Sequence, residues 1–255
     1  MYFDTHAHLD DEAFDSDRDE LVASFAASGV SRVLNASSDM ESSYATVALC
    51  EKYPFIYGAV GIHPEAAERF CDGDIETLAE LTKRKNIVAI GETGLDYYWD
   101  SVPRDVQKKV FEAQAALSME LSLPIVVHDR EAHRDCFEIL RKFPGIRAVY
   151  HCFSGSAEYA RELVKAGYYF SFGGAVTFKN ARHAPEVLCE IPRERVMLET
   201  DCPYMAPVPY RGKRNHSGLV PHIAAKISEL WGITPEEVGR LTTKNALEFF
   251  NIKGD

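Results

Sequence analysis

The sequence predicts an α/β protein of the (β/α)8 TIM-type barrel class, and three observations lead to that prediction. Eight short apolar runs alternate with segments of helical periodicity along the chain. The runs at 125–127 and 196–198 are apolar at every position, as in parallel strands that are buried on both faces. The chain has 255 residues, which matches the length typical of eight βα units. We therefore expect one barrel domain covering residues 1–255.

The first half of the chain shows four strands, each followed by a helix. The first helix repeats apolar residues at helical spacing between Leu21 and Phe25 and stops at Gly29. The second helix ends before Pro54, because proline disfavours helical backbone in the residue before it. In chain order, these strands and helices are expected at 1–6, 16–28, 30–35, 40–52, 55–61, 75–84, 87–91 and 103–121.

The second half repeats the alternation and closes with two helices. Pro124 precedes the fifth strand, and Gly167 ends the helix after the sixth. In chain order, these elements are expected at 125–128, 134–142, 147–151, 157–166, 168–172, 184–191, 195–200, 219–231 and 235–250. The alternative fold is an open doubly wound sheet, but the glycine-rich phosphate loop that would favour it is absent after the first strand.

The composition is that of an ordinary globular protein, with 46% hydrophobic and 26% charged residues. The net charge of −11 argues against general affinity for nucleic acid, although a local basic patch can still bind phosphate. Six cysteines without a CxxC pair indicate reduced thiols and a cytoplasmic protein. The N-terminal residues contain no signal-peptide pattern, and no run is long enough for a membrane span. We therefore expect no membrane partner.

Histidines and carboxylates follow most of the predicted strands. His6 and His8 are two residues apart, so on a strand their imidazoles point to the same side. Because the C-terminal ends of barrel strands face one central site, these side chains should converge. The residues that we expect there are His6, His8, Glu92, His128, His151 and Asp201. A single histidine in such a place is usually structural, but this set is sufficient to hold two divalent cations.

The motifs around these positions resemble one known family. They are FDTHAHLD (3–10), GIHP (61–64), GETGLDYYWD (91–100), PIVVHDR (124–130), HCFSGS (151–156), LETDCPY (198–204), APVPYRGKRN (206–215) and TTKNALEFF (242–250). The chain resembles the TatD-type deoxyribonucleases of the amidohydrolase superfamily, which are metal-dependent hydrolases. The resemblance spans almost the whole chain.

The resemblance implies a role for each member of the cluster. His6 and His8 would bind one metal and His128 and His151 the other, with Glu92 between them. Many relatives in the superfamily have a carboxylated lysine on the fourth strand, where this chain has Glu92, as the TatD family does. Asp201 would lie near the nucleophile, so Asp201 and Glu92 are the candidate catalytic residues. The expected cofactors are two divalent cations, with magnesium, manganese and zinc all compatible with these ligands.

Substrate contacts are expected around the metals. His63 would line the site or bind a neighbouring loop. The aromatic residues at 97–99, Tyr97 among them, would stack on bases or pack against the rim. The basic loop residues Arg211, Lys213 and Arg214 would clamp phosphate instead of forming a solvated face. Asn215, which follows them, is expected to contact the substrate as well.

The chain departs from the family pattern at one place. The family usually continues RGKRN with Glu-Pro, whereas this chain has His216 and Ser217. An imidazole therefore replaces a carboxylate at the rim of the expected site. The departure concerns substrate contacts more than the metals.

The function that these patterns favour is a metal-dependent deoxyribonuclease. A metal-activated water would hydrolyse phosphodiester bonds, and the mouth of a barrel suits a strand end, so we expect an exonuclease on single-stranded DNA, with RNA as a further substrate. The alternative is a dimetal hydrolase of a small amide, ester or phosphoester, whose signature would be an apolar pocket. A third hypothesis, a non-catalytic scaffold, does not explain the complete ligand set. We expect a monomer.

Overall fold

The structure is a computed structural model that describes residues 1–99 and 101–253. Asp100, the last residue of the GETGLDYYWD motif, and residues 254–255 lie outside the described residues. Eight strands follow one another in sequence order in a single sheet. They are β1 (Tyr2–Ala7), β2 (Val30–Ala36), β3 (Ile56–Val60), β4 (Ile87–Asp96), β5 (Ile125–Arg130), β6 (Ala148–Tyr150), β7 (Tyr169–Phe172) and β8 (Val196–Leu198). The predicted alternation and barrel class are confirmed.

Helices connect the strands. They are α1 (Arg18–Ser24), α2 (Met40–Lys52), α3 (Asp74–Leu81), α4 (Arg104–Leu121), α5 (His133–Leu140), α6 (Ala157–Lys165), α7 (His183–Glu190), α8 (Val220–Trp231) and α9 (Pro235–Phe249). Local sequence signals start two of them. Asp39 and Ser42 form a capping box at α2, and Thr234 and Glu237 form one at α9. Among the described residues, no helix has both the length and the apolar character that crossing a membrane requires.

Strand β4 differs from its prediction. It continues to Asp96, past the expected end at residue 91, so Glu92 lies within the strand. Gly94 has a φ of +147°, and a Cβ at this position would lie 2.0 Å from the carbonyl oxygen of His128. Glycine therefore permits the close approach of β4 and β5 that extends their pairing from Thr93 to Asp96. The GETGLD part of the motif therefore belongs to β4.

The first predicted helix is also different. It divides into α1 and a short 3-10 helix at Phe25–Ser28, which ends at Gly29 with a φ of +76°.

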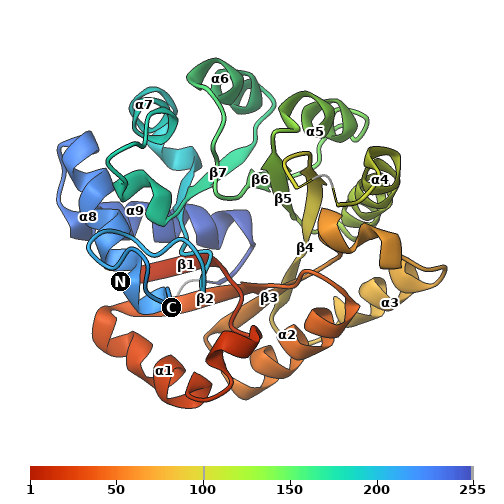
Figure 1. Ribbon diagram of the computed structural model, residues 1–255, viewed down its shortest axis with the longest axis horizontal. Helices are drawn as coiled ribbons and strands as arrows, with labels where there is room; N and C mark the ends of the chain where they lie inside the picture. The colour runs from red at the N-terminus through yellow and green to blue at the C-terminus, as the bar shows by residue number, and fades with distance from the viewer. Residues whose placement is uncertain (100, 254–255) are drawn as a thin grey trace. The chain divides into compact units, whose positions relative to one another are not determined.

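Residues 36–151 form one compact unit. It contains β3 to β6, and Figure 1 shows α2 to α5 along the outer side of its strands. Strand residues such as Ile90 and Val127 are completely buried, as is Phe111 on the inner face of α4. Burial of each such side chain stabilises the fold by about 1.5–3 kcal/mol relative to exposure, which explains why the strands are apolar on both faces.

Residues 1–35 and 152–253 belong to a second compact unit. Figure 1 shows α9, at the end of the chain, beside β1 at its beginning. Phe3 from β1 and Phe250 after α9 bring their ring centroids within 6.2 Å. Strand β1 also pairs in parallel with β2, and β7 pairs in parallel with β8. The two ends of the chain therefore share one core, which fixes the histidines at the end of β1.

Candidate metal centre

His6, His8 and Asp201 form a first cluster of metal-binding side chains, in the unit that contains both chain ends. The Nε2 atoms of His6 and His8 lie 3.3 Å apart. Oδ1 of Asp201 lies 3.3 Å from Nε2 of His8 and 3.9 Å from Nε2 of His6. Two imidazole nitrogens and a carboxylate oxygen this close together are a donor set that suits a divalent transition metal. We call this group the first half-site.

Backbone pairing positions the first half-site. The Asp201 N–H donates to the His6 carbonyl at 2.9 Å, and Asp201 adopts a left-handed conformation with a φ of +56°. The buried carboxylate of Asp4 accepts bonds from the Thr200 N–H at 2.8 Å and the Thr200 hydroxyl at 2.6 Å. Burial raises the pKa of Asp4 to about 6, although the bonds from Thr200 oppose this shift. Strand β1 and the segment after β8 are thus held together where their functional side chains begin.

Asn215 supports the same segment. Its side chain is buried, and its Nδ2 donates to the carbonyl oxygens of Thr200 at 2.8 Å and Tyr204 at 2.6 Å. Its Oδ1 accepts the His216 N–H. Asn215 therefore holds the loop on both sides of Asp201, and its expected contact with substrate stays a prediction.

A second half-site lies in the other unit and consists of His63, Glu92, His128 and His151. Oε1 of Glu92 lies 2.7 Å from Nε2 of His151, 2.8 Å from Nδ1 of His128 and 3.4 Å from Nε2 of His63. The nitrogens of His128 and His151 are 3.2 Å apart. Glu92 is only 3% exposed, and three imidazoles surround one of its oxygens. These donors also fit a divalent cation, since each can turn a lone pair toward the same point.

Asp96 orients the second half-site. Its Oδ2 lies 3.0 Å from Nε2 of His128, the nitrogen that does not face Glu92. Burial lowers the pKa of His128, but the hydrogen bonds to Asp96 and Glu92 outweigh burial and raise it to about 9. Burial lowers the pKa of His63, and the neighbouring charge of His128 adds to that effect.

Asp96 is absent from the set of site residues that the sequence predicts. A signal was available, because residues 92 and 96 share one face of a strand.

Two buried glutamines on α4 hold the backbone around this half-site. Gln114 accepts the Ile62 N–H at 2.8 Å and donates to the Ile62 carbonyl at 2.9 Å and the Thr93 hydroxyl at 2.6 Å. Gln107 accepts the Asp96 N–H at 2.9 Å and donates to the Asp96 carbonyl at 3.0 Å. Of the residues that they bind, Ile62 directly precedes His63 and Thr93 directly follows Glu92. The third, Asp96, is the partner of His128. Nothing in the sequence pattern identified either glutamine.

Glu199 is a further carboxylate absent from the expected set. It is completely buried, accepts the Cys152 N–H at 2.6 Å and accepts the Ser171 hydroxyl at 2.5 Å. The side chain thus connects β8, β7 and the backbone that follows His151. Its position two residues before Asp201 on the same strand end was the available signal.

Tyr97 packs against neighbouring helices. The guanidinium of Arg104 lies 4.1 Å from the centre of its ring, and its hydroxyl donates to Asp135 at 2.6 Å. The next residue, Tyr98, is 50% exposed and carries the guanidinium of Arg130 at 4.0 Å. The predicted stacking of Tyr97 on a base is untested, and Tyr98 has the more accessible ring.

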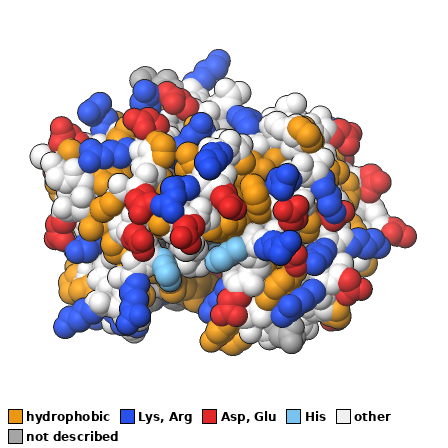
Figure 2. Space-filling model, turned by 90° about the horizontal axis from the view of Figure 1, so that it is seen from above, with side chains coloured by type: hydrophobic (Ala, Val, Ile, Leu, Met, Phe, Trp, Pro, Cys, Tyr) orange, Lys and Arg blue, Asp and Glu red, His pale blue; other side chains and the backbone are white. Residues whose placement is uncertain are grey.

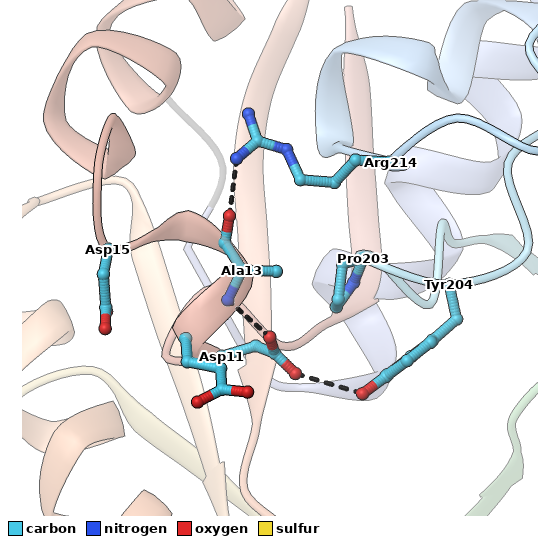
Figure 3. Close-up of a pocket in the computed structure, with 7 residues that line it drawn as sticks. Asp11, Ala13, Asp15, Pro203, Tyr204 and Arg214 are labelled. Carbon is cyan, nitrogen blue, oxygen red and sulfur yellow. Dashed lines mark hydrogen bonds between the residues drawn. The ribbon is translucent and has the colours of Figure 1, made fainter.

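Arg214 already has a carboxylate partner. Its guanidinium donates to both oxygens of Asp17, at 2.8 Å and 2.6 Å, and to the Ala13 carbonyl at 2.6 Å. Figure 3 shows Arg214 beside Ala13 at the edge of an open pocket, where the hydroxyl of Tyr204 donates to Asp11. The ion pair with Arg214 holds the pKa of Asp17 below its usual range. Any bond from Arg214 to phosphate therefore competes with Asp17.

The other basic residues of this loop are exposed. The guanidinium of Arg211 lies 4.4 Å from the ring centre of Phe178, and Nζ of Lys213 lies 5.9 Å from that of Tyr210. Figure 2 shows basic and acidic side chains intermixed over the face in view. The cationic side chains that could bind phosphate are therefore local features of a protein whose net charge is negative.

His216 lies half-buried next to this loop. Burial lowers its pKa, and the positive charge of Arg214 lowers it further. Its imidazole is therefore neutral at neutral pH, so it adds no cation to the rim.

Comparisons with known proteins find similar sequences and structures over almost the whole chain. The family described as TatD related DNase matches residues 3–251. The uncharacterized metal-dependent hydrolase YabD of Bacillus subtilis is 44% identical, over 99% of this chain and all of the relative. The 3'-5' ssDNA/RNA exonuclease TatD of Cronobacter sakazakii is 33% identical, over 97% of each chain. The crystal structure of YjjV, a TatD homologue of Escherichia coli, superposes with a TM-score of 0.92 at 29% identity, covering 99% and 98% of the two chains.

Proposed function

We propose, because this chain belongs to the TatD family of metal-dependent hydrolases, that it is an exonuclease that removes nucleotides from the ends of single-stranded DNA. RNA is a further proposed substrate. The observation that carries the proposal is the second half-site, where three imidazoles surround one oxygen of Glu92. A relative that is named an exonuclease on single-stranded DNA and RNA supports the choice of substrate.

We further propose that the two half-sites form one centre for two divalent cations. The barrel fold of the family supports this, because the C-terminal ends of all strands in such a barrel face one site. When bound, magnesium, manganese or zinc ions supply Lewis acidity and lower the pKa of a coordinated water. The proposed ligands are His6, His8, Glu92, His128, His151 and Asp201.

The protein's own groups prepare this chemistry. Once His128 has lost its Nδ1 proton, the Nε2–H bond to Asp96 leaves the Nδ1 lone pair on the side of Glu92, which is the orientation that a ligand needs. Asp201 presents Oδ1 beside His8, and we assign to this oxygen the proton of the attacking water. Its loop is fixed by Asn215, so the acceptor is held in place before substrate binds.

Substrate phosphates would be held by cations at the loop after β8. Arg211 and Lys213 are exposed and carry their charges over aromatic rings. Arg214 would contribute only by exchanging its bonds to Asp17 for bonds to phosphate. His63 contacts Glu92 and would face the reacting phosphate.

A second candidate function is hydrolysis of a small ester, amide or phosphoester. A cavity of about 250 Å³ between the loops after β6, β7 and β8 favours it, because the cavity is lined mainly by apolar side chains. Such a pocket suits a small organic group.

One experiment tests the proposed function. The protein is stripped of metal, reloaded with one type of ion at a time, and given end-labelled single-stranded DNA, single-stranded RNA or a neutral ester. We expect stepwise shortening of the labelled strands that depends on the ion. Rapid turnover of the ester with intact strands would favour the second candidate.

Three further expectations stay proposals. We propose that residues 1–255 form one domain, which the family match over residues 3–251 supports. We also propose a monomer that works in the cytoplasm. Six cysteines that are all free of disulfides are consistent with a reducing compartment.

A further inference from the structure

The cavity between the loops after β6, β7 and β8 has no part in the metal chemistry described above. It encloses about 250 Å³, below the size usual for a drug-like ligand, so it admits one ring system and no folded chain. Its aromatic wall is formed by Phe153, Phe172 and Phe178. Its polar lining groups come from Ser154, Asn180 and Arg182. Among the described residues, no carboxylate lines it.

The aromatic wall is preformed. Phe153 is 6% exposed and Phe172 is 1% exposed. The ring of Phe153 meets Phe170 edge to face at 4.9 Å and Phe172 at 6.3 Å. Rings fixed in this way bind a flat partner without losing much side-chain freedom.

The cavity adjoins groups near the first half-site, in the unit that contains both chain ends. Glu199 holds the Cys152 N–H, and Cys152 lines the cavity. Gly173 also lines it, and a Cβ at Gly173 would lie 3.3 Å from Cγ of Glu199. Met205, at the other side, is in the loop that begins at Asp201. The wall of the cavity at Met205 is therefore four residues along the chain from Asp201, the proposed proton acceptor.

Two stretches beside the cavity contain no acidic residue, in a protein with a net charge of −11. Residues 173–185 and 202–216 contain no aspartate or glutamate. The two loops are joined, because the Val208 N–H donates to the Thr177 hydroxyl at 2.9 Å. They carry the cations Lys179, Arg182, Arg211, Lys213 and Arg214. One-sided charge of this kind favours a polyanion.

Phe178 links the cavity to this charge. Its ring lines the cavity, and the guanidinium of Arg211 lies 4.4 Å from the ring centre. A flat apolar group and a neighbouring anion would be recognised together, which is the chemistry of a nucleotide. Aromatic rings stack on any nucleobase, and arginine pairs with phosphate.

We propose that this cavity binds the nucleobase of the terminal nucleotide of a single strand, while Arg211 and its neighbours hold the adjoining phosphates. This proposal rests on the proposed exonuclease function and adds a base subsite to it. Binding through stacking is tolerant of base identity, so the cavity would recognise the presence of a base and not its sequence.

The test compares two oligonucleotides that differ only in a terminal abasic nucleotide, placed at the end from which nucleotides are removed. A third carries the abasic nucleotide internally. For the native protein we expect kcat/KM for removal of the first nucleotide to fall about ten-fold or more without the terminal base, and to be unchanged by the internal one. Because the change is in the substrate, the result does not depend on how a variant folds.

A protein variant completes the test. Phe178→Leu keeps apolar volume and removes the ring, so its preference for the terminal base should shrink to about two-fold or less. Phe137→Leu is the matched control, since Phe137 is also half-buried under an arginine, with Arg141 at 5.6 Å, and lies on α5. It should behave like the native protein.

The outcomes separate the two proposals. Equal cleavage of both oligonucleotides by the native protein would overturn the base subsite and leave the exonuclease function standing. Intact strands, with a small neutral ester turned over rapidly, would overturn both. Loss of base preference in Phe137→Leu as well as Phe178→Leu would also count against a subsite at the cavity.

Discussion

Asp201 is held in an unusual backbone conformation beside His8. It has a left-handed backbone, with a φ of +56°, and its Oδ1 lies 3.3 Å from Nε2 of His8. The backbone of His6 and the side chain of Asn215 hold it there. Such a position suits a carboxylate that both binds a metal cation and accepts a proton.

The first prediction concerns this carboxylate. Asp201→Asn keeps an oxygen for the metal but loses the proton acceptor, so metal binding should be largely retained while kcat falls by about 10²–10⁴-fold. Titration calorimetry of the metal and steady-state cleavage of labelled DNA measure the two quantities. A variant that binds metal and cleaves DNA at nearly the native rate would make Asp201 a ligand only.

The second prediction concerns His216, whose pKa is lowered in the folded protein by burial and by Arg214. Between the folded and unfolded pKa values the unfolded chain binds more protons, so the stability that the neutral imidazole contributes is present above the unfolded pKa of about 6.5 and is lost as the pH falls. When the pH falls from 7.5 to 5.5, the native protein should lose this part of its free energy of unfolding, whereas His216→Gln should not. The free energy of unfolding of the variant should therefore rise relative to that of the native protein.

Urea unfolding of both proteins at the two pH values measures the difference. His222→Gln is the control, because it makes the same substitution at another histidine, on α8. An identical pH dependence of native protein and His216→Gln would contradict the assignment.

At the scale of elements, α4 is the scaffold of the second half-site. Gln107 and Gln114 are seven residues apart, which is about two helical turns, so they lie on one face of the helix. Each grips both the N–H and the carbonyl of one residue near the cluster. A helix that satisfies these backbone groups inside the protein also determines where His63 and Asp96 point.

The third prediction tests that role. Gln114→Met preserves length and volume but leaves the polar groups of Ile62 without their buried partner. We expect metal affinity to fall about 10–100-fold, as for other losses of groups that orient a ligand, with a smaller change in KM for DNA. Glu120→Met, on the exposed face of α4, is the matched control and should bind metal normally. If Gln114→Met bound metal as tightly as the native protein, Gln114 would have no role in positioning the metal ligands.

At the scale of the whole molecule, charge limits how the protein meets DNA. A net charge of −11 repels polyanions at long range, so binding depends on few local cations. Arg214 is held by Asp17, and Arg211 and Lys213 are exposed.

The fourth prediction follows from that balance. Each phosphate contact on a single strand contributes about −0.7 to the slope of log affinity against log salt, and we expect the slope of two to four contacts. Asp17→Asn releases Arg214 and should steepen the slope by about one contact. Arg211→Ala should make it shallower by about one contact and weaken binding for every base sequence. Fluorescence anisotropy over a series of salt concentrations measures the slopes. A slope that neither substitution changes would place the phosphate contacts elsewhere.

Sequence alone determined the order of strands and helices, because apolar periodicity and proline or glycine boundaries are local signals. Most boundaries lie within a few residues of expectation, and α2 spans residues 40–52 as expected. The spacing of His6 and His8 likewise placed two imidazoles on one side of β1, since alternation along a strand is a local property.

Only the tertiary structure decided the partners of these groups. The extension of β4 to Asp96 depends on the approach of β5, which glycine at position 94 permits. The bonds of Gln114 to Ile62 and of Arg214 to Asp17 join residues far apart in the chain. A hydrogen bond has no periodicity along the sequence, so its partner is fixed by how the elements pack.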